Sequence, residues 1–396
     1  METIRGIKIR KIFLDNNNWW AFYLKYRHLI RPSIIINVCK LLACGTAFFG
    51  FHQYTCQDCR NSKRVFHTCK SRFCSSCGKK ATEQWIAKNL RILPDTPWQH
   101  ITFTLPSELR PFFWLNRQLL NYIANKPAKI ITSLAKKKKL IPGIFMAIHT
   151  FGRDLKTNVH FHLSTTSGGL SLDHSKWIPE FFINHQTLKN IWKQQVIQIL
   201  RSLYKAGNLK LPPQLKHINS YASFNSWLNF LYQKQWVVHL QKKCSDHRKN
   251  IKYLGRYLKR PPMAETRILA YDGKHVSYVF LDHHDKQKTI ITLSVEEFIA
   301  RLIRHIPDSG FRLIRYYNWL SNRNRATLLP IVFKLLNLNQ PTNNNSISYH
   351  SLFFAAFGYD PLQCQICKSF MQLEYVNYPS KRNLVSHHEE LASAKS

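Results

Sequence analysis

Acidic side chains are scarce in this sequence. Its 396 residues carry 58 Lys and Arg against 21 Asp and Glu, which gives a formal net charge of +37 at pH 7. An ordinary soluble protein without a special partner rarely has such an excess along its whole length. The charge therefore favours a polyanionic partner, with nucleic acid as the first candidate and a membrane surface as the second.

Long apolar runs are also missing. The longest, residues 41–51, is interrupted and shorter than the roughly 20 residues that a membrane-spanning helix needs. The first 20 residues lack the continuous apolar segment and the small-residue cleavage site of a secretory signal. We therefore expect no membrane partner and a location inside the cell.

Cysteine, in contrast, is plentiful and clustered, because seven of the ten cysteines lie between Cys39 and Cys77. A chain of this length can bury enough apolar surface to need no disulfides, and cysteines of intracellular proteins more often bind metal or lie in cores. Two CxxC pairs, Cys56/Cys59 and Cys74/Cys77, are separated by fourteen residues. This spacing predicts one four-cysteine structural zinc site.

Further metal-binding side chains leave alternatives open. Cys69 is the alternate ligand, and Cys44, His52 and His67 could also replace a ligand or form a second site. The other interpretation, which we slightly prefer, is buried thiols and surface histidines. Near the C-terminus, Cys364 and Cys367 form a CxxC with no second pair nearby in the sequence.

Two histidines stand on either side of an apolar residue at His160-Phe161-His162. Residues 143–152 and 159–169 have the β-branched and aromatic content of two strands and are separated by a polar turn, which predicts a hairpin. Alternate side chains of a strand share a face, so both imidazoles can reach one ion. With 19 histidines in the chain, however, an HxH pair can also arise by chance.

Two tyrosines, Tyr253 and Tyr257, are spaced to lie on one face of a helix. An isolated pair of this kind is more often packed in a core, but here Arg256, Lys259 and Arg260 surround it and two prolines follow. A tyrosine nucleophile, a metal-binding histidine pair and basic residues together indicate chemistry on phosphodiesters.

The pattern of apolar residues predicts an α+β fold in three parts. We place a helical and cysteine-rich region at residues 1–95, a catalytic domain at 96–335, and a tail with its CxxC at 336–396. Four basic residues give the first part charge to contact phosphates: Arg60, Arg64, Lys70 and Arg72. Expected elements are two short helices within 12–50, a strand near 100–106, helices at 185–205 and 227–243, and a hairpin at 265–282.

Several motifs, in order, resemble those of one family. They are HTCKSRFCSSCG, WQHITFTLPSELRP, AIHTFGRDLKTNVHFHLSTTSGGL, YLGRYLKRPP and EEFIARLIRHIPDSGFRLIRYYNWL. The chain resembles the rolling-circle insertion-sequence transposases, in the two-tyrosine branch of the HUH (His-hydrophobic-His) endonuclease superfamily. The resemblance covers most of the chain and implies an N-terminal zinc-binding DNA-recognition domain before an HUH-type catalytic domain, whose central antiparallel sheet is flanked by helices.

The resemblance also implies a mechanism. The histidine pair would bind catalytic Mg²⁺ or Mn²⁺ with a third ligand, for which Asp154 is the first candidate and His149 the next. Tyr253 and Tyr257 would nick and join single-stranded DNA at the ends of the element through a 5′-phosphotyrosine intermediate. Asp154 could instead cap its polar turn. The expected location is the cytoplasm of a prokaryote, in association with the nucleoid.

Two alternatives remain at this point. A replication initiator or conjugative relaxase would share the histidines and tyrosines but not the cysteine-rich region. A non-catalytic zinc-dependent DNA-binding regulator would explain only the charge and the cysteines. A tyrosine helix on the face of the sheet opposite to the histidines would favour the regulator.

Overall fold

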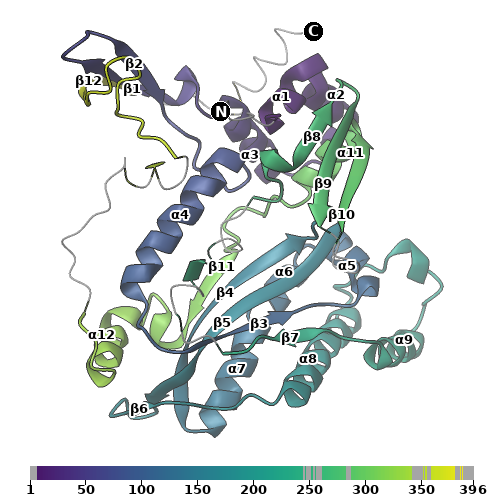
Figure 1. Ribbon diagram of the computed structural model, residues 1–396. Coiled ribbons are helices and arrows are strands. Elements are labelled where there is room, and N and C mark those ends of the chain that lie inside the picture. Colours follow the sequence, from purple (N-terminus) through teal and green to yellow (C-terminus); the bar gives the residue numbers. More distant parts are fainter. Residues whose placement is uncertain are drawn as a thin grey trace.

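The structure is a computed structural model, and it describes residues 7–243, 246, 251–252, 255, 261–281, 287–340, 351, 353–354, 358–379, 384 and 386. Among these residues, no helix is both long and apolar enough to cross a membrane. Helices and antiparallel strands are mixed along the chain, which confirms the predicted α+β class (Figure 1).

The helices of the described part are α1 (Ile9–Leu14), α2 (Asn18–Tyr26), α3 (Pro32–Ala43), α4 (Ser75–Ile92), α5 (Arg110–Leu115), α6 (Leu119–Ile123), α7 (Lys126–Lys137), α8 (His185–Lys205), α9 (Tyr221–Gln233), α11 (Val295–Ile303) and α12 (Arg325–Leu335). The strands are β1 (Phe51–Cys56), β2 (Ser62–Phe66), β3 (Trp98–Phe103), β4 (Leu140–Phe151), β5 (Thr157–Ser171), β6 (Trp177–Ile178), β7 (Val238–Leu240), β8 (Ile268–Tyr271), β9 (His275–Leu281), β10 (Lys288–Ser294), β11 (Ile314–Tyr317) and β12 (Met371–Asn377).

The largest sheet has the order β11-β4-β5-β3-β7, with β6 paired to β5. Its centre is the long hairpin of β4 and β5, whose strands pair antiparallel from Leu140 with Ser171 to Phe151 with Thr157. The hairpin predicted around the HxH motif is therefore confirmed. Antiparallel pairing alternates the side chains between two faces, and here both faces are covered.

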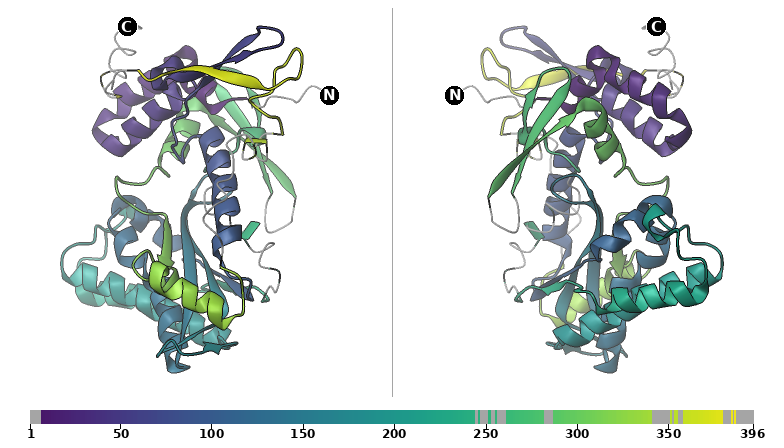
Figure 2. Two further views of the ribbon diagram at one scale, coloured as in Figure 1. Left: turned by 90° about the vertical axis from the view of Figure 1, so that its left-hand side faces the viewer. Right: turned by 90° about the vertical axis from the view of Figure 1, so that its right-hand side faces the viewer.

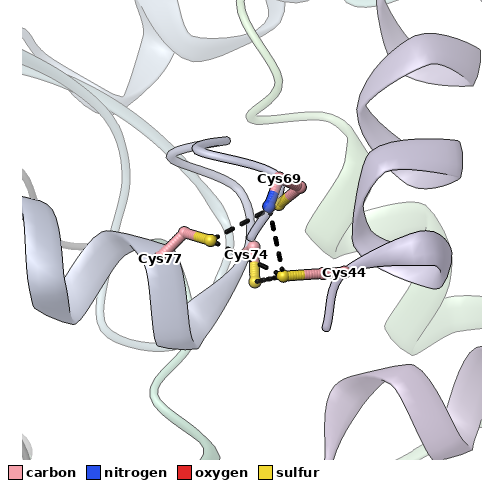
Figure 3. A group of neighbouring side chains, drawn as sticks. All are labelled: Cys44, Cys69, Cys74 and Cys77. Carbon is pink, nitrogen blue, oxygen red and sulfur yellow. Dashed lines mark hydrogen bonds between the residues drawn. The ribbon is translucent and has the colours of Figure 1, made fainter. Parts of the chain in front are cut away.

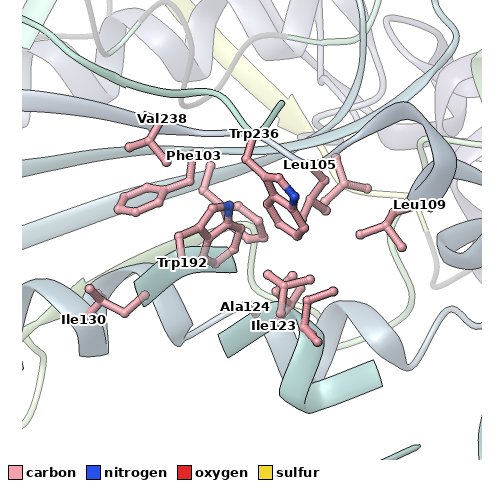
Figure 4. Close-up of a cluster of buried hydrophobic side chains, with 14 of the residues drawn as sticks. Phe103, Leu105, Leu109, Ile123, Ala124, Ile130, Trp192, Trp236 and Val238 are labelled. Atoms are coloured by element: carbon pink, nitrogen blue, oxygen red, sulfur yellow. The ribbon is translucent and has the colours of Figure 1, made fainter. Parts of the chain in front are cut away.

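One face of this sheet carries the main apolar core (Figure 4). Phe103 and Phe161 point from the sheet toward Trp192 of α8, and their rings meet at centroid distances of 5.3 and 5.6 Å. Helix α8 has the bounds that the sequence predicts, and it begins where the Asn184 side chain accepts a hydrogen bond from the Thr187 N–H. Helices α7, α8 and α9 thus cover this face.

The opposite face packs on α4. Trp85 and Ile86 of α4 share a buried cluster with Phe145 and Ala147 of β4 and with Ile251. A side chain added at Gly255 would collide with Ile86, because the ideal Cβ position lies 2.2 Å from its Cγ1. Ile251 and Gly255 therefore lie against α4, on the face of the sheet that carries the even-numbered residues of β5.

At the upper end in Figure 1, the N-terminal helices meet a second sheet. Ile12, Trp19 and Val38 from α1, α2 and α3 belong to one buried cluster with Val276 of β9 and Phe298 of α11. The sheet has the order β10-β9-β8, so the predicted hairpin at 265–282 is confirmed, and β10 adds a strand that the sequence did not predict. Figure 2 shows this end joined to the large sheet by α4.

A third sheet unites the two ends of the chain in the order β12-β1-β2. Strand β12 pairs antiparallel with β1 over all of β1, from Phe51 opposite Asn377 to Cys56 opposite Met371. The C-terminal residues 371–377 thus form part of the N-terminal cysteine-rich region (Figure 1).

Two of the predicted element bounds are wrong. The helix expected at 227–243 starts earlier and ends at Gln233, and residues 238–240 form β7 beside β3. The buried Trp236 indole donates to the Leu231 carbonyl across this break, which turns the chain toward the sheet. Three helices rather than two precede the cysteine-rich region, because Asn16 and Asn17 adopt positive φ and interrupt the helical run.

Candidate active site and cysteine clusters

Three histidines meet on the α4 face of the large sheet. Strand register places His149 of β4 directly opposite His160 of β5, and His162 follows two residues later on the same face. Their candidate ligand atoms all lie within 4.8 Å of one another. His149 and His162 are buried, whereas His160 is half-buried. We call this group the histidine site.

Hydrogen bonds fix which nitrogens of the histidine site can face an ion. Nδ1 of His160 lies 2.9 Å from the carbonyl oxygen of Asn158, to which it donates, so its Nε2 remains available. Nδ1 of His162 lies 3.2 Å from Nε2 of His100, a buried residue of β3. If Nδ1 of His162 donates there, its Nε2 is left as the ligand atom. Such outer partners orient metal-binding imidazoles and fix their tautomers.

The electrostatics favour the neutral form of His160 and His162. Burial lowers the pKa of His162 well below its usual value, and the neighbouring His149, His160 and His100 lower it further. Burial also lowers the pKa of His160, and it lowers that of His100 to about 4. Neutral imidazole is the form that binds a metal, so this donor set suits a divalent cation at physiological pH. The His100 contact was not predicted from the sequence.

Asp154, the first candidate for the third ligand, does not join the histidine site. Its Oδ1 accepts a hydrogen bond from the Lys156 N–H at 3.1 Å, and its Oδ2 lies 3.9 Å from Lys156 Nζ. Asp154 therefore caps the turn between β4 and β5, as Asp commonly does in polar turns. His149, the second candidate, is the residue that meets the histidine pair.

The two tyrosines, Tyr253 and Tyr257, and the neighbouring Arg256, Lys259 and Arg260 lie outside the described residues. Their described neighbours Ile251 and Gly255 contact the cluster formed by α4 and the histidine-bearing face of the sheet. Farther along, a Cβ at Gly78 near the start of α4 would lie 2.8 Å from Pro261. Ile251, Gly255 and Pro261, three described residues near the two tyrosines in the sequence, thus lie against α4.

The first cysteine cluster consists of Cys44, Cys69, Cys74 and Cys77, and we call it the local cluster (Figure 3). Its Sγ atoms lie 3.5–3.7 Å apart across the contacting pairs, and the Cys69 N–H also points at Cys44 Sγ. Contacts with the neighbouring thiols lower the pKa of Cys77 and raise that of Cys74. Four sulfurs at this spacing match tetrahedral metal coordination.

The second cysteine cluster consists of Cys56, Cys59, Cys364 and Cys367, and we call it the split cluster. The predicted single site of Cys56, Cys59, Cys74 and Cys77 is therefore wrong, because the structure divides these residues between two clusters. Cys69 and Cys44, which the sequence left as alternates, complete the local cluster. The C-terminal CxxC, which has no partner nearby in the sequence, meets Cys56 and Cys59 in space.

The basic residues predicted to contact phosphates differ in exposure. Arg60, Arg64 and Lys70 are exposed, and the Arg64 guanidinium lies over the Phe51 ring and donates to the Gln53 amide oxygen. Arg72 is half-buried, and burial lowers its pKa to about 10, which still leaves it charged at neutral pH. The exposed three are therefore better placed to reach a ligand from solvent.

Comparison with known proteins agrees with this arrangement. A family model described as a putative transposase matches residues 143–327, and one described as a transposase zinc-binding domain matches residues 16–105. The chain is 37% identical over 358 residues to the transposase for insertion sequence element IS801 of Pseudomonas savastanoi pv. phaseolicola, with 90% of this chain and 86% of the relative covered.

A putative transposase of Sinorhizobium fredii is 28% identical over 336 residues, which cover 82% of this chain and 84% of that protein. No solved structure matches the chain. A transposase acts on DNA and cuts and transfers its strands, and the zinc-binding match accords with the cysteine clusters. The chain belongs to the family of insertion-sequence transposases that carry an N-terminal transposase zinc-binding domain.

Proposed function

We propose that this transposase nicks and joins single-stranded DNA at the ends of its own element through a 5′-phosphotyrosine intermediate, as in rolling-circle transposition. In this proposal, Tyr253 and Tyr257 are the nucleophiles. The histidine site holds a catalytic divalent cation.

One observation carries the proposal. Ile251 and Gly255 pack with α4 on the same face of the sheet as His149, His160 and His162. A helix on the opposite face would have been separated from the histidines by the sheet, as expected for a regulator with incidental histidines. The described neighbours of the tyrosines instead approach from the side where the imidazoles gather.

The donor set also supports a choice of metal. Three imidazoles with no carboxylate among them favour Mn²⁺ over Mg²⁺, because Mg²⁺ prefers oxygen ligands. A cation bound there would neutralise charge on the non-bridging oxygens of the target phosphate. The half-buried His160 leaves a side through which a DNA strand can approach.

In the proposed reaction, the phenol oxygen of one tyrosine loses its proton and bonds to phosphorus while the P–O3′ bond breaks. The departing 3′ oxygen takes up a proton, which leaves a free 3′ hydroxyl and a 5′-phosphotyrosine. A phenol is mostly protonated at neutral pH, so basic neighbours such as Arg256, Lys259 and Arg260 would favour the phenolate and the charged phosphate. The second tyrosine would serve the later transfer.

We also propose that the local cluster binds the structural zinc of the N-terminal domain. All four of its thiols fall within the segment matched by the zinc-binding domain. Arg60, Arg64 and Lys70 on the nearby surface would contact phosphates, which positions the DNA without specifying its sequence.

The deciding experiment incubates the purified full chain and Mn²⁺ with labelled single-stranded oligonucleotides from the ends of the element. We expect a covalent protein–DNA adduct on a denaturing gel. The adduct should be lost in the double variant Tyr253→Phe/Tyr257→Phe and retained in Tyr221→Phe, an exposed tyrosine of α9 that serves as the matched control.

Single variants then separate the roles of the two tyrosines. An adduct that persists in the double phenylalanine variant would remove both residues from the nucleophile role. No adduct with any end sequence, from protein that still binds DNA, would contradict the catalytic proposal and favour a binding protein.

A further inference from the structure

The split cluster brings together side chains from the two ends of the chain. Sγ of Cys56 lies 3.3 Å from Sγ of Cys367, and Sγ of Cys59 lies 3.5 Å from those of both Cys364 and Cys367. These distances are far longer than an S–S bond of about 2.05 Å. They are close to the roughly 3.8 Å that separates sulfurs bound tetrahedrally to zinc at about 2.3 Å.

The two CxxC loops share a set of backbone hydrogen bonds and a positive φ although they lie 308 residues apart. Arg60 and Lys368, each next after a second cysteine, have positive φ of 58° and 66°. Their N–H groups donate to the carbonyl of the first cysteine at 3.0 and 3.1 Å. The N–H of that first cysteine donates to Asn61 or Ser369 at 2.9 and 2.8 Å. Both loops therefore form matching knuckles that present two sulfurs each.

Apart from the strand pairing of β12 with β1, little apolar burial holds these knuckles together. The buried apolar cluster around them contains Cys56, Cys364 and Met371, with Tyr54 packed against it. A three-stranded sheet with so small a core is not stable by burial alone, and natural units of this size usually add a metal or disulfides. Cys56 and Cys364 are almost fully buried, so their thiols contact mainly other thiols instead of water.

We propose that the split cluster is a second zinc site, distinct from the local cluster, and that its zinc clasps the C-terminal strand β12 onto the N-terminal hairpin of β1 and β2. The segment matched by the zinc-binding domain ends at residue 105 and contains only two of the four ligands. The whole catalytic sheet is thereby inserted between the two halves of one small metal-binding unit. This inference does not depend on the chemistry proposed for the histidine site.

Metal content tests the site directly. Purified full-length wild type and the variant Cys364→Ser/Cys367→Ser are compared by inductively coupled plasma mass spectrometry, with Cys39→Ala as the control because Cys39 is a buried thiol outside both clusters. We expect the double variant to contain one zinc per chain fewer than wild type and Cys39→Ala to match wild type. Equal zinc in all three proteins, or iron in place of zinc, would overturn the assignment.

A second experiment tests whether the zinc holds β12 onto β1 and β2 in the folded protein. A protease recognition sequence is inserted within residues 341–350 of the full chain, which is purified with zinc, cleaved and passed through a gel-filtration column. The C-terminal fragment should co-elute with the rest of the chain in the wild-type background and separate from it in the Cys364→Ser variant. A fragment that separates from the zinc-loaded wild type, or that stays bound in the variant, contradicts the clasp.

Discussion

The cysteine clusters and the histidine site show two ways in which this fold gathers metal ligands. Each cysteine cluster supplies four sulfurs, so a tetrahedral ion would have no open position. The histidine site supplies three nitrogens on a rigid sheet and leaves coordination positions for water or substrate. Closed sets suit structural ions and open sets suit catalysis. The comparison predicts that damage to the first costs folding and damage to the second costs activity.

The largest effect is expected from Cys74→Ser in the local cluster. Cys69, Cys74 and Cys77 belong to the same buried cluster as the N-terminal helices, so lost coordination would expose that core. Structural zinc can contribute roughly 10–16 kcal/mol to folding at pH 7. We expect this variant to lose its zinc and its cooperative thermal transition. Circular dichroism measures the transition. A transition within a few degrees of that of Cys39→Ala would refute the structural role.

The histidine site should respond in the opposite way. His160→Ala/His162→Ala removes two ligands from one face of an intact hairpin, so we expect the metal-dependent adduct to disappear while cooperative unfolding persists. The matched control is His28→Ala/His217→Ala, which changes two exposed histidines. Nicking that survives in the first variant would show that these histidines do not hold the catalytic ion.

A smaller effect should come from His100, which touches His162 rather than the proposed ion. His100→Leu removes the ring nitrogen that contacts His162 Nδ1, whereas His100→Gln keeps a polar group near the same place. Partners of this kind typically change metal affinity by about 10- to 100-fold. We therefore expect weaker Mn²⁺ binding, measured by electron paramagnetic resonance titration, in the Leu variant and recovery in the Gln variant. Equal losses in both would indicate a packing role.

The smallest predicted effect concerns how the free energy of unfolding depends on pH through His305. His305 is buried, its Nε2 donates to the Leu155 carbonyl, and burial lowers its pKa to about 4. The unfolded state, with a pKa near 6.5, binds more protons, so this contribution is fully favourable above about pH 6.5 and is lost as the pH falls toward 4.

Between pH 7.5 and 5.0, wild type should therefore lose about 2 kcal/mol more unfolding free energy than His305→Gln. Denaturant unfolding at both pH values measures the difference. Identical pH slopes in the two proteins would show that His305 does not titrate on unfolding.

Local patterns could be predicted because they depend on neighbouring residues. The hairpin around His160 and His162 and the bounds of α8 follow from strand alternation and helical spacing. The third member of the histidine site could be narrowed only to Asp154 or His149, because the choice depends on how β4 and β5 are aligned. The observed register, which places His149 opposite His160, decides it.

The partners of each CxxC could not be predicted from spacing. Every such pair presents two sulfurs in the same way, so Cys56 and Cys59 look equally suited to Cys74/Cys77 and to Cys364/Cys367. The outcome depends on the path of some 300 intervening residues, which brings β12 beside β1. Long-range pairing of this kind depends on the whole topology rather than on any local propensity.

The split cluster also has a consequence for the order of synthesis. Ribosomes add about 5–20 residues per second, and the second CxxC pair lies 308 residues after the first. Cys364 and Cys367 are therefore synthesised roughly 15–60 s after Cys56 and Cys59. A chain whose translation stops before residue 364 lacks Cys364 and Cys367, so its N-terminal region has only two of the four cysteines of the split cluster. Completion of this one small site would therefore show that translation has passed Cys367.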